Sequence, residues 1–202
     1  YIVIPAYNEE MNITSVAREW HTVVETISED SKLVIIDDGS KDSTYQVLTE
    51  LSKELPQLEV ITKKNSGHGA TVLYGYRYAL EQNADYIFQT DSDGQTLPEE
   101  FYGFWELRDK YSAVIGYRNH RKDGFSRVFV TKTLKFVLWC IFKLNITDAN
   151  TPFRLLNRDV LQRHISKIPK DFNLSNVMLT ICLVKYKENI RFIPITFKPR
   201  QG

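Results

Sequence analysis

The sequence contains few cysteines and no long apolar run. Two cysteines, Cys140 and Cys182, occur among 202 residues, and both lie in apolar stretches. This number is too small for a disulfide framework, so we expect buried thiols in a reducing compartment. No stretch of about 18 uninterrupted apolar residues occurs, and the first residues read as a strand rather than a cleavable leader. We therefore expect no membrane span within these residues.

The sequence also lacks an excess of charge of either sign. Lys and Arg number 26 against 25 Asp and Glu, a net charge of +1, which gives no reason to expect nucleic-acid binding. No internal repeat or low-complexity linker interrupts the chain. With 43% apolar and 25% charged residues, the chain can bury one good core. We expect a single domain over residues 1–202.

Two common phosphate-binding motifs are missing. There is no Walker A sequence, and Val72 stands where the dinucleotide fingerprint G-x-G-x-x-G needs its third glycine. The segment Lys64-Asn65-Ser66-Gly67-His68-Gly69 nevertheless supplies two glycines and a cation. Such a loop suits the close approach of the backbone to a nucleotide.

Short Val- and Ile-rich runs alternate with helical patterns along the chain. Strands are expected at residues 1–5, 33–36, 58–62, 85–90, 113–116 and 190–197. Helices are expected from Asn8 to about residue 28, from Asp42 or Ser43 to Pro56, and at 70–82, 98–110 and 174–185. This alternation predicts an α/β fold with a mostly parallel sheet, helices on both faces and ligands at the strand carboxyl ends.

The most informative segment, Asp91-Ser92-Asp93-Gly94-Gln95, follows a predicted buried strand. Two carboxylates one residue apart can reach one divalent cation together and leave room for substrate oxygens. Mg²⁺ or Mn²⁺ held by so few carboxylates usually takes its other ligands from water and phosphate. The segment therefore indicates a nucleotide or another diphosphate substrate, although a solvated turn or a helix cap would have the same pattern.

Two further strand ends carry polar residues. Pro5-Ala6-Tyr7-Asn8-Glu9 follows the first predicted strand, and Asp37-Asp38-Gly39-Ser40-Lys41-Asp42 follows the second. Asp38 could accept a hydrogen bond from a base or a ribose. Either segment alone also fits helix capping. Three polar strand ends on one sheet edge favour a ligand site.

Together these segments resemble the family 2 glycosyltransferases of the GT-A fold. The matching motifs are residues 2–10, 35–44, 65–69 and 91–95, in that order. Later motifs look like the branch that transfers sugars to dolichyl or polyprenyl phosphate. They are Gly116-Tyr117-Arg118 with Arg121, Asp123 and Arg127, then residues 148–155, and a truncated closing motif at 200–202.

The resemblance implies transfer of a hexose-type sugar, with inversion, from a nucleoside diphosphate sugar, with UDP slightly favoured over GDP. Asp93 would be the central ligand of Mg²⁺ or Mn²⁺, with Asp91 and Gln95 binding or supporting the same ion. By the same resemblance the donor nucleotide would contact Pro5, Ala6, Tyr7, Glu9, Asp38, Lys64, Gly67, Asp91 and Ser92.

A lipid phosphate acceptor is already ionised near pH 7, so it needs cationic docking more than a strong base. Arg118 and Arg127 are the first candidates, followed by Arg121 and Lys132, although a solvated basic loop would look the same. Asp148 is a candidate catalytic base or organiser of the acceptor site, or else a turn residue.

Two absences bear on the acceptor. Residues 173–176 lack the carboxylate that family members acting on hydroxyls often carry, which favours a phosphate acceptor. The Gln-x-x-Arg-Trp signature of processive synthases does not occur, which argues against polymer extension.

Residues 128–146 mix aromatic side chains with lysines, which suits a membrane interface, a helix packed on the sheet, or both.

We expect residues 1–117 to bind the nucleotide sugar and the metal, and residues 118–202 to face the acceptor and a membrane. The protein would work at the cytoplasmic face of a membrane, either peripherally or anchored by segments outside this chain. One alternative is a family 2 enzyme acting on a sugar or protein hydroxyl in polysaccharide or glycoprotein assembly. Another is a non-catalytic nucleotide- or lipid-binding module.

Overall fold

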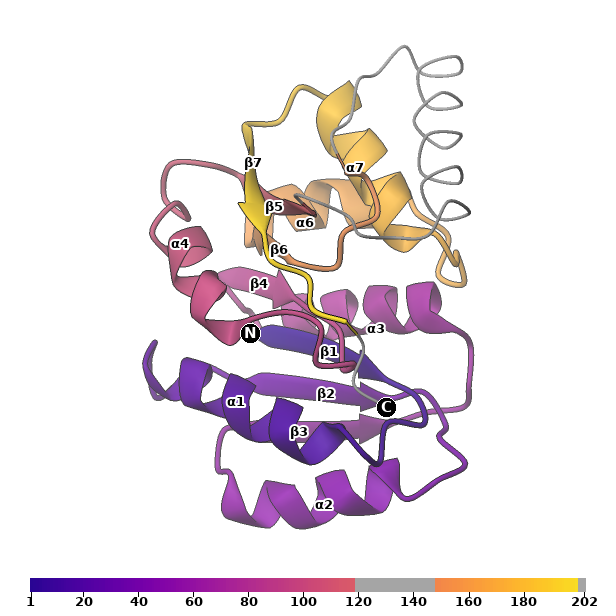
Figure 1. Ribbon diagram of the computed structural model, residues 1–202. Coiled ribbons are helices and arrows are strands. Elements are labelled where there is room, and N and C mark those ends of the chain that lie inside the picture. Colours follow the sequence, from indigo (N-terminus) through magenta and orange to yellow (C-terminus); the bar gives the residue numbers. More distant parts are fainter. Residues whose placement is uncertain (119–147, 200–202) are drawn as a thin grey trace.

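The structure, a computed structural model, describes residues 1–118 and 148–199 (Figure 1). Within these residues the strands form one seven-stranded sheet in the order β3-β2-β1-β4-β6-β5-β7. The strands are β1 (Ile2–Ala6), β2 (Leu33–Asp37), β3 (Leu58–Thr62), β4 (Tyr86–Gln89), β5 (Ala113–Arg118), β6 (Arg154–Asn157) and β7 (Ile190–Ile195).

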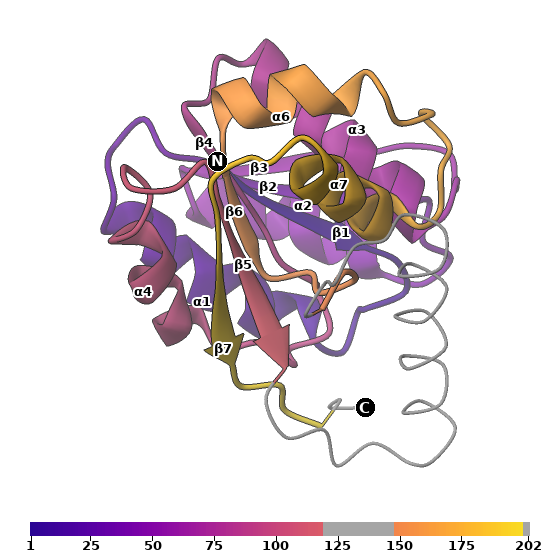
Figure 2. The same ribbon diagram turned by 90° about the horizontal axis from the view of Figure 1, so that it is seen from above.

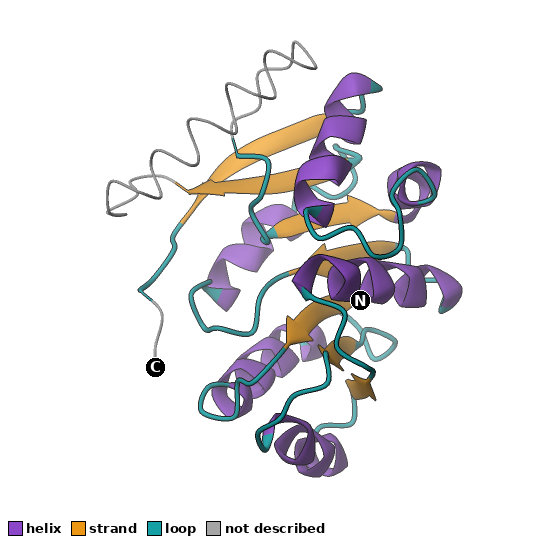
Figure 3. Cartoon of the chain, turned by 90° about the vertical axis from the view of Figure 1, so that its right-hand side faces the viewer, coloured by secondary structure: helices purple, strands orange, loops and turns teal. Residues whose placement is uncertain are grey.

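The sheet is mostly parallel, as predicted. Strands β1 to β4 run parallel to one another, and β7 runs parallel to β5. Strand β6 lies between β4 and β5 and is antiparallel to both, so the sheet is mixed on this side. The strands change direction progressively across the sheet (Figure 3), which is the usual twist of neighbouring strands.

Helices cover both faces of the sheet, and each face has its own apolar core. On one face lie α1 (Ile13–Glu25), α2 (Thr44–Glu54), a short 3₁₀ helix (Pro98–Glu100) and α4 (Phe101–Trp105). The other face carries α3 (His68–Glu81), α6 (Arg158–Ile165) and α7 (Ser175–Lys185), as the view from above shows (Figure 2). In the described residues, no helix is long and apolar enough to cross a membrane.

The first core centres on Trp20 of α1. Its indole lies 5.5 Å from the ring of Phe88 and 5.9 Å from that of Phe153, centroid to centroid. Phe88 belongs to β4, and Phe153 immediately precedes β6. The packing therefore fixes α1 against the strands whose ends carry the polar segments.

Most predicted elements are confirmed, two bounds are corrected and one helix was missed. Helix α1 begins at Ile13 and not at Asn8, because Asn8 has a left-handed backbone with φ 54°. Helix α4 ends at Trp105 rather than near residue 110. Helix α6 was missed, although Asn157 caps it by accepting the backbone N–H of Val160 at 2.9 Å.

Two further side chains, Tyr76 and Cys182, are buried. Tyr76 is fully buried and donates a hydrogen bond to Oε1 of Gln89 at 2.6 Å, so it packs in the core. Cys182 is buried with a free thiol, as expected, and burial raises the pKa of that thiol. Cys140 lies outside the described residues.

Glu188, in the turn before β7, ties α6 to the end of α7. Its carboxylate accepts hydrogen bonds from Arg163 at 2.9 Å and from Nε2 of His164 at 2.7 Å. Burial alone would raise the pKa of this carboxyl, but the bonds from Arg163 and His164 hold it below its ordinary value. The carboxylate therefore stabilises the fold above the unfolded pKa, and that contribution is lost as pH falls through the folded pKa.

Glu188→Gln is expected to lower the free energy of unfolding at pH 7 by about 1–2 kcal/mol, since it removes a charged hydrogen-bond partner. The difference from wild type should narrow as pH falls below the ordinary carboxyl pKa of about 4.3. Urea unfolding of both proteins across that range measures it. A gap that stays constant with pH would show that the charge of Glu188 is not involved.

Candidate active site

A cavity of about 380 Å³ opens at the carboxyl ends of β1, β2 and β4. Most of the predicted donor-site residues lie on its wall, which consists of Pro5, Ala6, Tyr7, Glu9, Asp38, Asn65, Gly67, His68, Thr71, Asp91, Ser92 and Asp93. Lys64 and Gln95 do not line it. Four segments that are far apart in sequence therefore meet at one edge of the sheet, and they include the three polar strand ends that the sequence predicted to meet there.

The loops after β1 and β2 hold each other in place. The side chain of Asn8 accepts the backbone N–H of Lys41 at 2.8 Å, and the N–H of Asn8 donates to the hydroxyl of Ser40 at 2.9 Å. The N–H of Glu9 donates to the hydroxyl of Thr44 at 2.8 Å. The polar residues after β1 therefore join two loops instead of capping α1.

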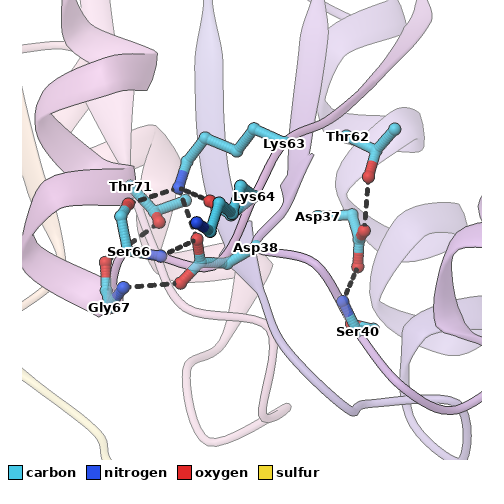
Figure 4. Close-up of polar contacts among 9 residues, drawn as sticks. All are labelled: Asp37, Asp38, Ser40, Thr62, Lys63, Lys64, Ser66, Gly67 and Thr71. Atoms are coloured by element: carbon cyan, nitrogen blue, oxygen red, sulfur yellow. Dashed lines mark hydrogen bonds and ion pairs between the residues drawn. The ribbon is translucent and has the colours of Figure 1, made fainter.

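Asp38 organises the loop after β3 (Figure 4). Its buried carboxylate accepts the backbone N–H groups of Ser66 at 2.9 Å and Gly67 at 2.8 Å, and it pairs with the ammonium of Lys63. Burial alone would raise the pKa of Asp38, but the hydrogen bonds from Lys63 and Ser66 lower it. The ionised carboxylate thus fixes one wall of the cavity.

The neighbouring Asp37 points away from this wall (Figure 4). It accepts the hydroxyl of Thr62 at 2.7 Å and the backbone N–H of Ser40 at 3.2 Å. Both carboxylates are buried, but Asp37 does not line the cavity. Asp37 therefore supports the edge of the sheet, whereas Asp38 forms part of the cavity wall.

Gly39 lets the loop after β2 pass close to the loop after β3. Its φ is +67°, and a Cβ there would lie 2.9 Å from the backbone nitrogen of Asn65 and 3.0 Å from the carbonyl oxygen of Lys63. A side chain at this position would be strained by the backbone and would also press on main-chain atoms. Glycine is thus needed for the two loops to meet.

The Asp91-Ser92-Asp93 segment forms another part of the cavity wall. Oδ1 of Asp91 lies 2.9 Å from Nε2 of His68, and Oδ1 of Asp93 accepts the backbone N–H of Gln95 at 3.1 Å. Burial would lower the pKa of His68, but the hydrogen bond and charge of Asp91, with the charges of Asp93 and Asp38, raise it. The cavity is therefore an environment that favours cations.

The carboxylates of Asp91 and Asp93 fit a hard divalent cation that would also be bound by a phosphate. Across residues 1–118 and 148–199, no cluster of three or more His, Cys, Asp or Glu side chains could hold a metal by itself. Asp91 and Asp93 supply two carboxylates on one cavity wall, and the remaining positions would go to water and phosphate oxygens. The amide nitrogen of Gln95 donates to the carbonyl of Lys198 at 2.7 Å, so its role toward the metal stays a prediction.

The predicted acceptor residues are only partly described. The guanidinium of Arg118, at the end of β5, forms an ion pair with Asp148 through distances of 3.0 and 3.3 Å. It also stacks over the ring of Phe197, 5.1 Å from the centroid. Neither residue of the pair lines the cavity. Residues 119–147 and 200–202, which include Arg121, Arg127 and Lys132, lie outside the described residues.

A comparison with protein families identifies the domain. The model of the family described as glycosyl transferase family 2 matches residues 1–165. The chain belongs to this family. The resemblance seen in the sequence motifs is confirmed, and the domain is a glycosyltransferase.

Curated relatives of this glycosyltransferase include enzymes named for lipid phosphate acceptors. It is 27% identical to the UDP-N-acetylglucosamine–dolichyl-phosphate N-acetylglucosaminyltransferase of Methanococcus voltae, over 96% of this chain and 84% of that protein. It is also 27% identical to the undecaprenyl-phosphate 4-deoxy-4-formamido-L-arabinose transferase of Pseudomonas fluorescens, over 79% of this chain. The match spans 47% of that second protein, so the chain corresponds to less than half of it.

Solved structures confirm the GT-A fold. Glucosyl-3-phosphoglycerate synthase of Mycobacterium tuberculosis, in complex with Mn²⁺, UDP and phosphoglyceric acid, superposes with a TM-score of 0.70. That match has 16% identity and covers all of this chain and 70% of the synthase. S. aureus TarS in complex with UDP gives a TM-score of 0.68 at 16% identity, over all of this chain and 60% of TarS. At such low identity the likeness concerns the fold alone.

The structure adds residues that the motifs did not single out. Lys63, rather than Lys64, pairs with Asp38. His68 and Thr71 reach the cavity from the first turn of α3. The sequence signal for Lys63 is its position directly after β3. Thr62, the last residue of β3, donates a hydrogen bond to Asp37. Because successive side chains of an extended chain point in opposite directions, Lys63 points away from Asp37 and pairs with Asp38.

Proposed function

We propose that this domain moves a sugar from a nucleoside diphosphate donor to a polyprenyl phosphate, with the help of Mg²⁺ or Mn²⁺. The observation that carries the proposal is the cavity at the strand ends, which Asp91 and Asp93 line together with a loop that Asp38 holds in place. UDP is favoured over GDP because the names of a curated relative and of two structural relatives contain it.

The chemistry requires charge neutralisation more than proton transfer. The bond from the anomeric carbon to the diphosphate breaks, and a bond to an oxygen of the acceptor phosphate forms on the opposite face of the sugar. Negative charge gathers on the departing diphosphate, and a divalent cation, when bound, would neutralise it. Asp91 and Asp93 would hold that cation, while the loop around Gly67 approaches the nucleotide.

The acceptor side would contain Arg118 and Asp148. The acceptor phosphate is ionised near neutral pH, so the reaction does not need Asp148 as a base. Its contact with the guanidinium, at 3.0 Å, suits it better to orient Arg118 toward a phosphate. Because polyprenyl phosphates reside in bilayers, this side would face the cytoplasmic surface of a membrane.

The test of the function is a transfer assay with separate acceptors. The protein with Mn²⁺ is given radiolabelled UDP-sugars and a short-chain polyprenyl phosphate, and the product is extracted into organic solvent. We expect extractable label with the polyprenyl phosphate, and none with the unphosphorylated polyprenol. Label that stays in water on a sugar or peptide acceptor would favour the hydroxyl-glycosylating alternative. UDP binding without any turnover would favour a binding module.

Arg118→Met is expected to raise the acceptor KM by about 10- to 100-fold, since a charged hydrogen bond contributes about 1.5–3 kcal/mol. The affinity for UDP with Mn²⁺ should stay within about twofold, because Arg118 does not line the donor cavity. Initial rates over a range of acceptor concentrations measure the first effect, and calorimetry measures the second.

Arg108→Met is the matched control. Arg108 also lies over an aromatic ring, 4.5 Å from the centroid of Trp105, but in the turn that follows α4. Its acceptor KM should equal that of wild type. If Arg118→Met lost as much affinity for the donor as for the acceptor, the assignment of Arg118 to the acceptor subsite would be wrong.

Gly39→Ala is expected to weaken UDP binding by about tenfold or more, because the added methyl group would push against the main chain of residues 63–65 and displace the cavity wall. Gly103→Ala is the control, since a Cβ there meets nothing within 4 Å. Calorimetric titration of UDP with Mn²⁺ compares the two proteins. Similar affinities in both would show that the contact at Gly39 does not shape the donor site.

A further inference from the structure

Arg154 is a fully buried arginine whose hydrogen-bond partners are neutral oxygens. It lies on β6, opposite Gln89 of β4 and Ile115 of β5. A buried charge is costly unless its donors are satisfied, so a fixed arrangement of acceptors must surround this guanidinium. The arrangement joins two segments that are distant in the sequence.

The first segment is the loop that follows Asp148. Nε of Arg154 donates to the carbonyl of Thr151 at 3.0 Å, and Nη2 donates to the carbonyls of Thr151 and Ala149. The guanidinium therefore reaches back over the loop that connects Asp148 to β6. The side-chain hydroxyl of Thr151 is buried without a hydrogen-bond partner, so this side chain does not help to hold the loop.

The second segment is the first part of α7. Nη1 of Arg154 donates to the carbonyl of Asn176 at 3.2 Å and to the hydroxyl of Thr180 at 3.3 Å. The hydroxyl of Thr180 is in turn 3.1 Å from the carbonyl of Ala149. Arg154 and Thr180 thus form a clamp between the loop and the helix.

From this geometry we propose that Arg154 is a positioning residue for the acceptor side. It fixes the loop of residues 148–151 on α7 and thereby sets the place of Asp148 and, through the ion pair, of Arg118. The inference rests on the proposed function for its consequence in catalysis. Arg154 touches neither the cavity nor the reacting groups, and it acts through the loop.

The planar fork of arginine suits this position better than an ammonium group. Three carbonyls and a hydroxyl lie in different directions around the guanidinium, and its five N–H donors point along a rigid plane. Lysine would present one small ammonium group to the same oxygens. Arg154→Lys should therefore keep the charge and restore part of the function that Arg154→Met loses.

The first test is kinetic. Arg154→Met should raise the KM for a short-chain polyprenyl phosphate at least tenfold and leave the affinity for UDP with Mn²⁺ within twofold, with Arg154→Lys in between. The double variant Arg154→Met/Asp148→Asn should have an acceptor KM no higher than that of the more severe single variant, because both residues act through one loop. Thr180→Val, of nearly equal shape, should cause a smaller change in the same direction and serves if Arg154→Met does not fold.

The second test reads the clamp directly. Amide hydrogen exchange at residues 149–151 should be at least tenfold faster in Arg154→Met than in wild type. In Leu155→Ala, a core variant of the residue next to Arg154 on β6, exchange at these residues should be slower than in Arg154→Met. Unchanged exchange, an unchanged acceptor KM, or additive effects with Asp148→Asn would overturn the inference. If Asp148→Asn alone has normal acceptor kinetics, the acceptor assignment fails, and exchange then decides whether Arg154 holds the loop.

Discussion

Asp93→Asn is expected to lower kcat for sugar transfer by at least about 10³-fold, because the neutral amide cannot hold a cation against the charge on the departing diphosphate. Asp93 lies on the cavity wall beside Asp91, and its carboxylate accepts the backbone N–H of Gln95 at 3.1 Å. The amide has nearly the same size, so the loss would come from charge and not from packing. Single-turnover assays with saturating donor and Mn²⁺ measure the chemical step.

Asp109→Asn serves as the control for this experiment. Asp109 is a surface carboxylate that accepts a hydrogen bond at 2.7 Å from the hydroxyl of Tyr86, the first residue of β4, and it does not line the cavity. Its kcat should match that of wild type. An Asp93→Asn protein that works within about tenfold of wild type would remove Asp93 from the catalytic site.

Asp38→Asn is expected to weaken binding of UDP by about 100-fold, which corresponds to about 3 kcal/mol. The carboxylate accepts two backbone N–H groups and the ammonium of Lys63, and an amide can accept through only one oxygen. One wall of the donor cavity would therefore lose its support. Calorimetric titration with UDP in the presence of Mn²⁺ measures the change.

Asp37→Asn separates this effect from general destabilisation. Asp37 is the adjacent, equally buried carboxylate, and its partners Thr62 and Ser40 lie away from the cavity. This variant should lose stability and retain UDP affinity within about threefold. If both variants lost affinity equally, the role of Asp38 as the organiser of the nucleotide wall would be untenable.

The sequence pattern predicts the first half of the sheet well, for a physical reason. Strands that are buried on both faces need continuous apolar residues, and β2, which is buried along its whole length, begins at Leu33 as predicted and ends at Asp37, one residue later than predicted. The pattern fails where a local conformation departs from the simple rule. Asn8 adopts φ 54° because its side chain bonds the loop after β2, and a contact over 33 residues is invisible in a local window.

The meeting of the cavity residues could be predicted because the carboxyl ends of parallel strands lie at one edge of the sheet. The contact between Arg118 and Asp148 could not be predicted, although each residue was named as a candidate. Arg118 and Asp148 are 30 residues apart, and they meet because β6 enters the sheet antiparallel between β4 and β5. Arg154 likewise contacts Asn176 only through the packing of α7 on the loop after Asp148. No spacing rule in the sequence encodes these contacts.

Anomalous diffraction from a crystal soaked with Mn²⁺ and UDP would test the proposed metal site directly. We expect one strong manganese peak in the cavity, within coordination distance of Asp93 and of oxygens of the diphosphate, and no such peak in Asp93→Asn crystals. UDP bound in the cavity of the wild-type protein with no manganese beside Asp91 or Asp93 would contradict the central claim.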